Sequence, residues 1–72
     1  MQCLITMKSM TYTVRAEVVL KNNGLQAKAV KLDGEDARRG CAHGVRVLCR
    51  DRRRIEELLR ENRIPYSQIR TE

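Results

Sequence analysis

The residues best suited to chemistry lie together in one short stretch of the chain. It reads Arg38-Arg39-Gly40-Cys41-Ala42-His43-Gly44 and holds a cysteine, two glycines, two arginines and the only histidine. Cationic neighbours favour the thiolate, which is the nucleophilic form of cysteine, and glycine lets other groups approach closely. The stretch therefore predicts that Cys41 is a reactive or group-carrying thiol. The alternative is an ordinary buried cysteine that acts as a small apolar residue.

Cys41 and His43 are also residue types that bind metals. A structural zinc site needs four ligands, and the sequence has no paired ligands at a matching spacing. We therefore expect no metal and no other cofactor. A catalytic pair of Cys41 and His43 is an alternative, but no third residue that would orient His43 is evident.

The length and the apolar content limit what the protein can be. A chain of 72 residues makes one domain, here residues 1–72, and buries too little surface to be more than marginally stable. A homodimer would bury more surface. No apolar run approaches the roughly 20 residues of a membrane helix, and the start does not resemble a signal peptide. Three cysteines do not suggest a disulfide framework, so we expect a cytoplasmic protein without membrane contact.

The charge invites a nucleic-acid interpretation. The net charge is +6, mostly from arginine, but the chain has only two tyrosines and no other aromatic residue. Proteins that bind single strands stack bases on aromatic side chains or on aligned arginines. Nucleic-acid binding is therefore the weakest alternative, and the charge equally suits an acidic protein partner or a small anion.

The elements that must position Cys41 follow from the pattern of apolar residues. We predict strands over 3–7, 25–32, 45–49 and 66–70, helices over 11–23 and after Asp51, and a long polar loop over 33–44. Ser9 or Thr11 is a plausible N-cap of the first helix, and Gly24 is a good stop. Val14 and Val18 lie opposite the main apolar stripe of that helix, which indicates a wide core stripe or a partner surface.

The order strand, helix, strand, strand, helix, strand predicts an α+β, ferredoxin-like βαββαβ fold. Two helices would cover one face of a four-stranded antiparallel sheet, with the first and third strands in the centre. Cys41 would then lie near Lys8, Ser9 and the positively charged start of the first helix. Cys3 and Cys49 would lie at the opposite edge, where core packing is favoured over a redox pair.

Several short segments resemble one known family. The resemblance covers most of the chain through Leu4-Ile5-Thr6-Met7, Ala16-Glu17-Val18-Val19-Leu20-Lys21-Asn22-Asn23-Gly24-Leu25, Gly40-Cys41-Ala42-His43-Gly44-Val45 and Ile64-Pro65-Tyr66. The chain is similar to the small bacterial proteins described as selenium/sulfur carrier-like. The resemblance implies a ferredoxin-like fold and a Cys41 that carries sulfur or selenium as a persulfide or perselenide.

A carrier of this kind would be a group-transfer protein rather than a turnover catalyst, and its partners would be a sulfur or selenium donor and an acceptor. We expect the loop N–H groups and the cations of the Cys41 stretch to hold the anionic product, with Ser9 nearby. The alternative is a non-enzymatic interaction or regulatory module in which Cys41 is only structural. The residues that the carrier interpretation assigns to binding are Arg38, Arg39, Gly40, Ala42, His43, Gly44 and Ser9.

Overall fold

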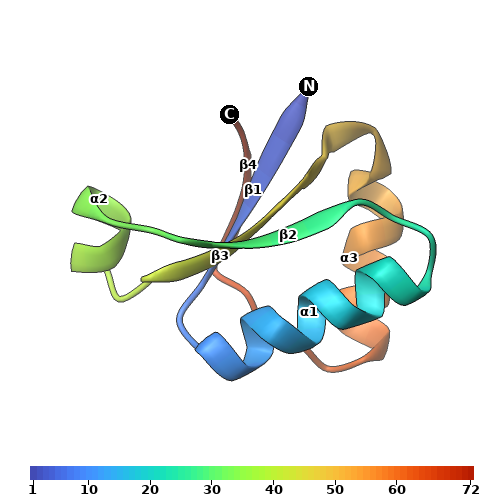
Figure 1. Ribbon diagram of the computed structural model, residues 1–72, viewed down its shortest axis with the longest axis horizontal. Helices are drawn as coiled ribbons and strands as arrows, with labels where there is room; N and C mark the ends of the chain where they lie inside the picture. Colours follow the sequence, from blue (N-terminus) through green and yellow to red (C-terminus); the bar gives the residue numbers. More distant parts are fainter.

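The computed structural model describes all residues, 1–72, as a four-stranded antiparallel sheet with three helices and one 3-10 turn. The elements are β1 (Gln2–Met7), α1 (Met10–Asn22), β2 (Ala27–Lys31), α2 (Gly34–Arg38), β3 (His43–Leu48), η1 (Cys49–Asp51), α3 (Arg52–Glu61) and β4 (Gln68–Thr71). The strand order is β2-β3-β1-β4, which confirms the predicted α+β class and the central position of β1 and β3. The helices α1 and α3 lie together, away from α2, which stands at the far end of β2 and β3 (Figure 1).

The core forms where one face of the sheet meets α1 and α3. Alternate residues of a strand point to the same face, so Cys3, Ile5 and Met7 of β1 share one face. All three are buried in a cluster that also takes residues from both long helices and from β2 and β3. The helical and strand contributions to this cluster are Ala16, Leu20, Ala27, Val45, Val47, Ile55, Leu58, Leu59 and Ile64.

The opposite face of β1 is buried as well. Leu4 and Thr6 are only 3% and 2% exposed, although neither faces the long helices. Leu4 is paired with Arg46 on β3 and with Arg70 on β4, so two long cationic side chains flank it. Arg46 donates two hydrogen bonds to Glu72, at 2.6 and 3.1 Å. On this second face, the aliphatic parts of the Arg46 and Arg70 side chains therefore flank Leu4, while their charged ends bond to carboxylates.

Gly44 shows how tightly β3 packs against this second face. A Cβ atom at this position would lie 2.8 Å from the carbonyl oxygen of Ile5 and 3.1 Å from the side chains of Leu4 and Leu32. Real Cβ atoms do not approach backbone oxygens so closely, and a backbone oxygen in a central strand cannot move aside. The glycine after the Cys41 region is thus required by strand packing.

The first helix has the caps that its sequence predicts. The Oγ of Ser9 accepts a hydrogen bond from the N–H of Tyr12, and the Ser9 carbonyl accepts from the N–H of Thr13. Gly24 follows the last turn with φ +77°, a conformation that glycine adopts without strain. No helix of the protein combines the length and the apolar character that crossing a bilayer requires.

Two expectations about the elements were wrong. The polar loop over 33–44 contains the short helix α2, which begins after Asp33 and ends before Gly40. Val14 and Val18 do not belong to a wide core stripe: they are 47% and 50% exposed, because only the Ala16 and Leu20 side of α1 faces the sheet. Together with Met10 they form an exposed apolar line along α1.

The sulfur atoms of Cys3 and Cys49 are joined in a disulfide, whereas the sequence favoured two separate core cysteines. The reason is the path of the chain after β3. Leu48 is the last strand residue, paired with Gln2, and Cys49 then turns into η1 with its N–H donating to the carbonyl of Met1. This turn brings the two Cα atoms to 5.0 Å, a normal distance for a disulfide.

We predict that this disulfide supplies a large part of the stability. It closes a sequence separation of 46 residues, for which the loss of unfolded-state entropy amounts to about 4 kcal/mol. The double variant Cys3→Ala/Cys49→Ala should unfold at a clearly lower urea concentration than the oxidised parent. Equilibrium urea denaturation followed by circular dichroism measures the difference.

Reductant provides the control for this prediction. Dithiothreitol should lower the urea midpoint of the parent protein to about the level of the double variant and should leave the double variant unchanged. Equal midpoints for the parent with and without reductant would show that the bond contributes nothing to stability.

Candidate functional site

Cys41 lies beside the start of β4, at the end of the sheet where β1 finishes. The register of the sheet explains this position, because Met7 pairs with His43 on β3 and Thr6 pairs with Gln68 on β4. Residues 41 and 67 therefore flank the same end of β1. The Sγ–H of Cys41 donates a hydrogen bond to the Oγ of Ser67 at 3.2 Å, and the Ser67 N–H donates to the carbonyl of Thr6 at 2.8 Å.

The backbone around Cys41 is held by α2. Gly40 follows the C-cap residue of that helix and has φ +90°, which lies in the left-handed region that favours glycine. The N–H of Gly40 donates to the carbonyl of Ala37, and the N–H of Cys41 donates to the carbonyl of Asp36 at 2.8 Å. These two main-chain donors already bond to carbonyl groups of α2, so in this structure they hold the turn rather than point to an anion on the sulfur.

A polar cavity of about 220 Å³ surrounds the thiol side of Cys41. Its walls come from the end of β1, from α2 and from the start of β4, and the lining residues are Thr6, Lys8, Asp36, Arg39, Cys41, Ser67 and Gln68. Cys41 as a whole is only 5% exposed, which differs from the accessible thiol expected of a carrier. The sulfur nevertheless has hydroxyl and cationic neighbours rather than an aliphatic surrounding.

Asp36 connects this cavity to β4. Its two carboxylate oxygens accept hydrogen bonds from Arg70 at 2.8 and 2.7 Å, an arrangement of two parallel charge-assisted bonds. These hydrogen bonds are the main reason why the pKa of Asp36 lies below its usual value. The same bonds raise the pKa of Arg70, to which the negative charge of a Cys41 thiolate adds a smaller contribution. Arg70 is therefore within electrostatic reach of the sulfur.

Of the cationic side chains around the Cys41 cavity, two are paired with carboxylates and one is not. Arg39 donates to Glu35 at 3.1 Å, and Arg70 is engaged by Asp36. Lys8 has no carboxylate within 4.0 Å, so its ammonium group is the cation of the cavity that lacks a partner. Lys8 is therefore available to pair with an anion bound in this cavity.

The other residues that the sequence assigned to binding lie elsewhere. Arg38 is an exposed residue of α2 paired with Glu35, and Ser9 serves as the N-cap of α1. The Ala42 carbonyl accepts from the N–H of Leu32, and His43 is the first residue of β3. Of the predicted set, only Cys41 and Arg39 line the cavity. No group of three histidine, cysteine, aspartate or glutamate side chains is arranged to hold a metal ion.

Sequence reasoning missed Ser67, which makes the closest polar contact to the sulfur. The signal was available in the predicted topology. An antiparallel last strand beside β1 must begin where β1 ends, so its first residues reach the same end of the sheet as Cys41. Asp36 was also missed, because it falls in the expected loop over 33–44 and no periodicity marks a helix of five residues.

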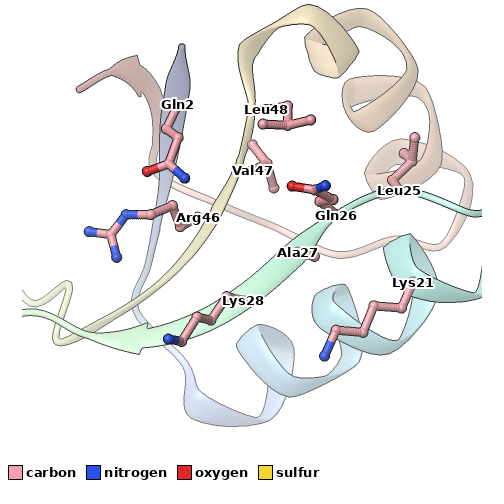
Figure 2. A pocket seen from close by; sticks show the side chains of 9 residues that line it. All are labelled: Gln2, Lys21, Leu25, Gln26, Ala27, Lys28, Arg46, Val47 and Leu48. Carbon is pink, nitrogen blue, oxygen red and sulfur yellow. The ribbon is translucent and has the colours of Figure 1, made fainter.

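A second hollow, of about 360 Å³, lies between the end of α1, the start of β2 and the neighbouring part of β3. Figure 2 shows Lys21, Lys28 and Arg46 among its lining residues, together with Gln2 and Gln26. Lys21 is paired with Glu17 and Arg46 with Glu72. No cysteine, serine, threonine or histidine lines the hollow, so it offers no counterpart to the thiol chemistry of Cys41.

Comparison with known proteins identifies the family. Residues 2–70 match the family described as "Putative Se/S carrier protein-like". The chain belongs to this family. No match is found among curated proteins or among solved structures. The family match spans nearly the whole chain and includes Cys41, Ser67 and every other residue that lines the cavity of this Se/S carrier-like protein.

Two ion pairs make the stability of this protein dependent on pH in the acid range. Arg70 lowers the pKa of Asp36 and Arg46 lowers the pKa of Glu72, both chiefly through hydrogen bonds. A carboxylate whose pKa is lower in the folded state contributes stability that is fully present above its unfolded pKa, about 3.9 for aspartate and 4.3 for glutamate. This contribution is lost as the pH falls through the lower folded value.

We therefore expect urea midpoints to be steady near neutral pH and to fall below about pH 4. Asp36→Asn should flatten part of this decline. It should also speed hydrogen exchange of the Cys41 amide several-fold, because α2 loses its attachment to Arg70. Glu35→Gln is the matched control, since Glu35 pairs only with exposed arginines of its own segment. Equal effects of the two variants would contradict the role assigned to Asp36.

Proposed function

We propose that the protein carries sulfur or selenium on Cys41 as a persulfide or perselenide. The observation that supports this proposal most directly is the position of the Cys41 sulfur in a polar cavity with the hydroxyl of Ser67 and the unpaired cation of Lys8. The fold that presents it is ferredoxin-like in our interpretation, because the order of the elements without α2 and η1 is βαββαβ.

The transfer step needs only a thiolate and a donor persulfide. The Cys41 thiolate attacks the terminal sulfur of a donor R–S–SH. A new S–S bond forms on Cys41, the S–S bond of the donor persulfide breaks, and the donor leaves as its thiolate R–S⁻. No net oxidation occurs, and the same balance applies when selenium replaces the transferred sulfur. A cysteine desulfurase is a donor of the required kind.

The groups around the Cys41 sulfur can accommodate both the thiol before transfer and the anionic persulfide after it. The Ser67 hydroxyl accepts from the Cys41 thiol and can donate once the thiol has lost its proton, because a hydroxyl has both capacities. A cavity of about 220 Å³ has room for one additional sulfur or selenium atom and for part of the donor. Lys8 and Arg39 supply positive charge for the anionic persulfide.

The disulfide between Cys3 and Cys49 leaves Cys41 as the one free thiol of the chain. The four residue steps from Cys3 to Met7 along β1 span about 13 Å, and Cys41 lies past the Met7 end of the strand. A persulfide on Cys41 is therefore not attacked by another thiol of the same molecule. This arrangement favours delivery to an acceptor on a different molecule.

Location and partners are part of the same proposal. We infer a sulfur or selenium donor protein and an acceptor protein, and we retain the cytoplasmic location as a prediction. Disulfides are uncommon in the reducing cytosol, so the redox state of Cys3 and Cys49 in cells lysed directly into an alkylating agent tests the location. A homodimer remains a prediction that sedimentation would check.

The carrier proposal predicts a specific adduct. The protein should be purified without reductant and incubated with a cysteine desulfurase and free cysteine. Intact mass spectrometry should then show the mass of one added sulfur atom on the parent chain, and peptide mapping should place it on Cys41. Cys41→Ser should gain nothing, and Cys3→Ala/Cys49→Ala should gain the adduct as the parent does. If Cys41→Ser gains the same adduct, the carrier role is refuted.

An interaction module is the second candidate, and two observations favour it. Cys41 is 5% exposed, and the line of Met10, Val14 and Val18 leaves an apolar strip of α1 without a partner in the monomer. In this case Cys41 would react with iodoacetamide only when the protein unfolds. Alkylation that is fast without denaturant and insensitive to low urea concentrations would exclude this candidate.

A further inference from the structure

A third hollow adjoins the Cys41 cavity. It measures about 300 Å³, and its lining residues are Lys8, Ser9, Tyr12, Pro65, Tyr66 and Ser67. We call this hollow the tyrosine groove, because it contains both tyrosines of the chain. Tyr66 is 38% exposed, so part of its ring is accessible to a partner.

The tyrosine groove and the Cys41 cavity share two residues. Lys8 and Ser67 line both, and Ser67 is the residue whose Oγ bonds to the Cys41 sulfur. A peptide segment bound in the groove would therefore lie next to the Cys41 thiol. The groove is built from the start of α1 and from the connection between α3 and β4, which are held on the same end of the sheet as Cys41.

The rim of the groove carries unpaired positive charge. Arg15 lies over the ring of Tyr12 at 5.7 Å and donates only to the carbonyl of Asn62. Arg60 and Arg63 line a shallow hollow with Tyr12 and Pro65. None of these arginines, nor Lys8, has a carboxylate within 4.0 Å. On the other side of Tyr66 the acidic residues are Glu56 and Glu57, of which Glu57 pairs with Arg54.

The surface combines features that complement one kind of occupant. Two aromatic rings and a proline offer an apolar floor for an aliphatic or aromatic side chain. Four unpaired cations around it attract carboxylates and raise the rate of encounter with an acidic surface. We propose that the tyrosine groove docks an acidic segment of the partner protein, anchored by an apolar side chain, and presents that segment's sulfur to Cys41. This inference rests on the carrier function proposed above.

The docking step can be tested without thiol chemistry. The probe is a six-residue peptide with a central leucine and serine flanked by glutamates, and its counterpart carries lysines in place of the glutamates. Titration of each peptide into ¹⁵N-labelled protein should give amide shifts at Lys8, Tyr12, Tyr66 and Ser67 for the acidic peptide alone. Raising the salt concentration should weaken these shifts, because the Debye length shortens.

Matched variants separate the groove from the overall charge. Lys8→Gln should weaken binding of the acidic peptide about two- to fivefold, the range of an exposed ion pair, and Tyr66→Ala should weaken it as well. Lys28→Gln removes the same charge from an unpaired lysine outside the groove, and Val18→Ala trims another exposed apolar residue of α1. Neither control should change the affinity. Equal losses from Lys8→Gln and Lys28→Gln would overturn the proposal, as would equal shifts from both peptides.

A final arm links docking to transfer. The serine of each peptide is replaced by cysteine activated as its 2-pyridyl disulfide. The Cys41 thiolate attacks the peptide sulfur, a mixed disulfide forms, and pyridine-2-thiolate leaves and takes up a proton. The acidic peptide should react at least about tenfold faster than the basic one at low salt.

The titration tests docking and the exchange reaction tests the reactive thiol, so either hypothesis can be refuted without the other. Groove shifts with no disulfide exchange would leave docking in place and refute the reactive thiol. Exchange at equal rates for both peptides, without groove shifts, would leave the thiol in place and refute docking. Stronger groove shifts from a single-stranded RNA than from the acidic peptide would replace the protein segment by a nucleic acid.

Discussion

The antiparallel pairing of β1 with both β3 and β4 is the constraint on which the site depends. Thr6 is matched with Gln68 on one side, and Met7 is matched with His43 on the other. These two registers bring Ser67 and Cys41, 26 residues apart, to a sulfur–oxygen distance of 3.2 Å. A shift of one residue in either pairing would turn the side chains to the other face and separate the two groups.

This pairing works because β1 is buried on both faces. Cys3, Ile5 and Met7 face the helices, while Leu4 and Thr6 are buried on the other face, where Leu4 lies between Arg46 and Arg70 of the neighbouring strands. Because both faces are buried, separating β1 from the sheet would expose apolar side chains on both sides and would cost a large free energy. The candidate site therefore lies at the end of a strand whose residues Cys3–Met7 are all buried.

The charges around the thiol follow from the same geometry. Because β4 lies beside β1, Arg70 reaches Asp36 on α2 and fixes the segment that leads to Cys41. The nearby carboxylates are thereby neutralised, and Lys8 remains unpaired at the boundary between the Cys41 cavity and the tyrosine groove. The disulfide at the other end of β1 removes the two remaining thiols from competition. One free thiol, one unpaired ammonium group and one adjoining groove are consistent with a protein that exchanges a group with other proteins.

The sequence by itself determined the α+β class, the central first and third strands, the caps of α1 and the choice of Cys41, because these depend on local patterns of apolar, capping and glycine residues. Short-range patterns could not reveal α2, whose five residues carry no apolar period, or the exposure of Val14 and Val18, which depends on the angle at which α1 meets the sheet. The Cys3–Cys49 bond, the Ser67 contact and the Asp36–Arg70 pair were decided only by tertiary structure. Each joins residues 26 to 46 positions apart, and only the register of the strands fixes such distances.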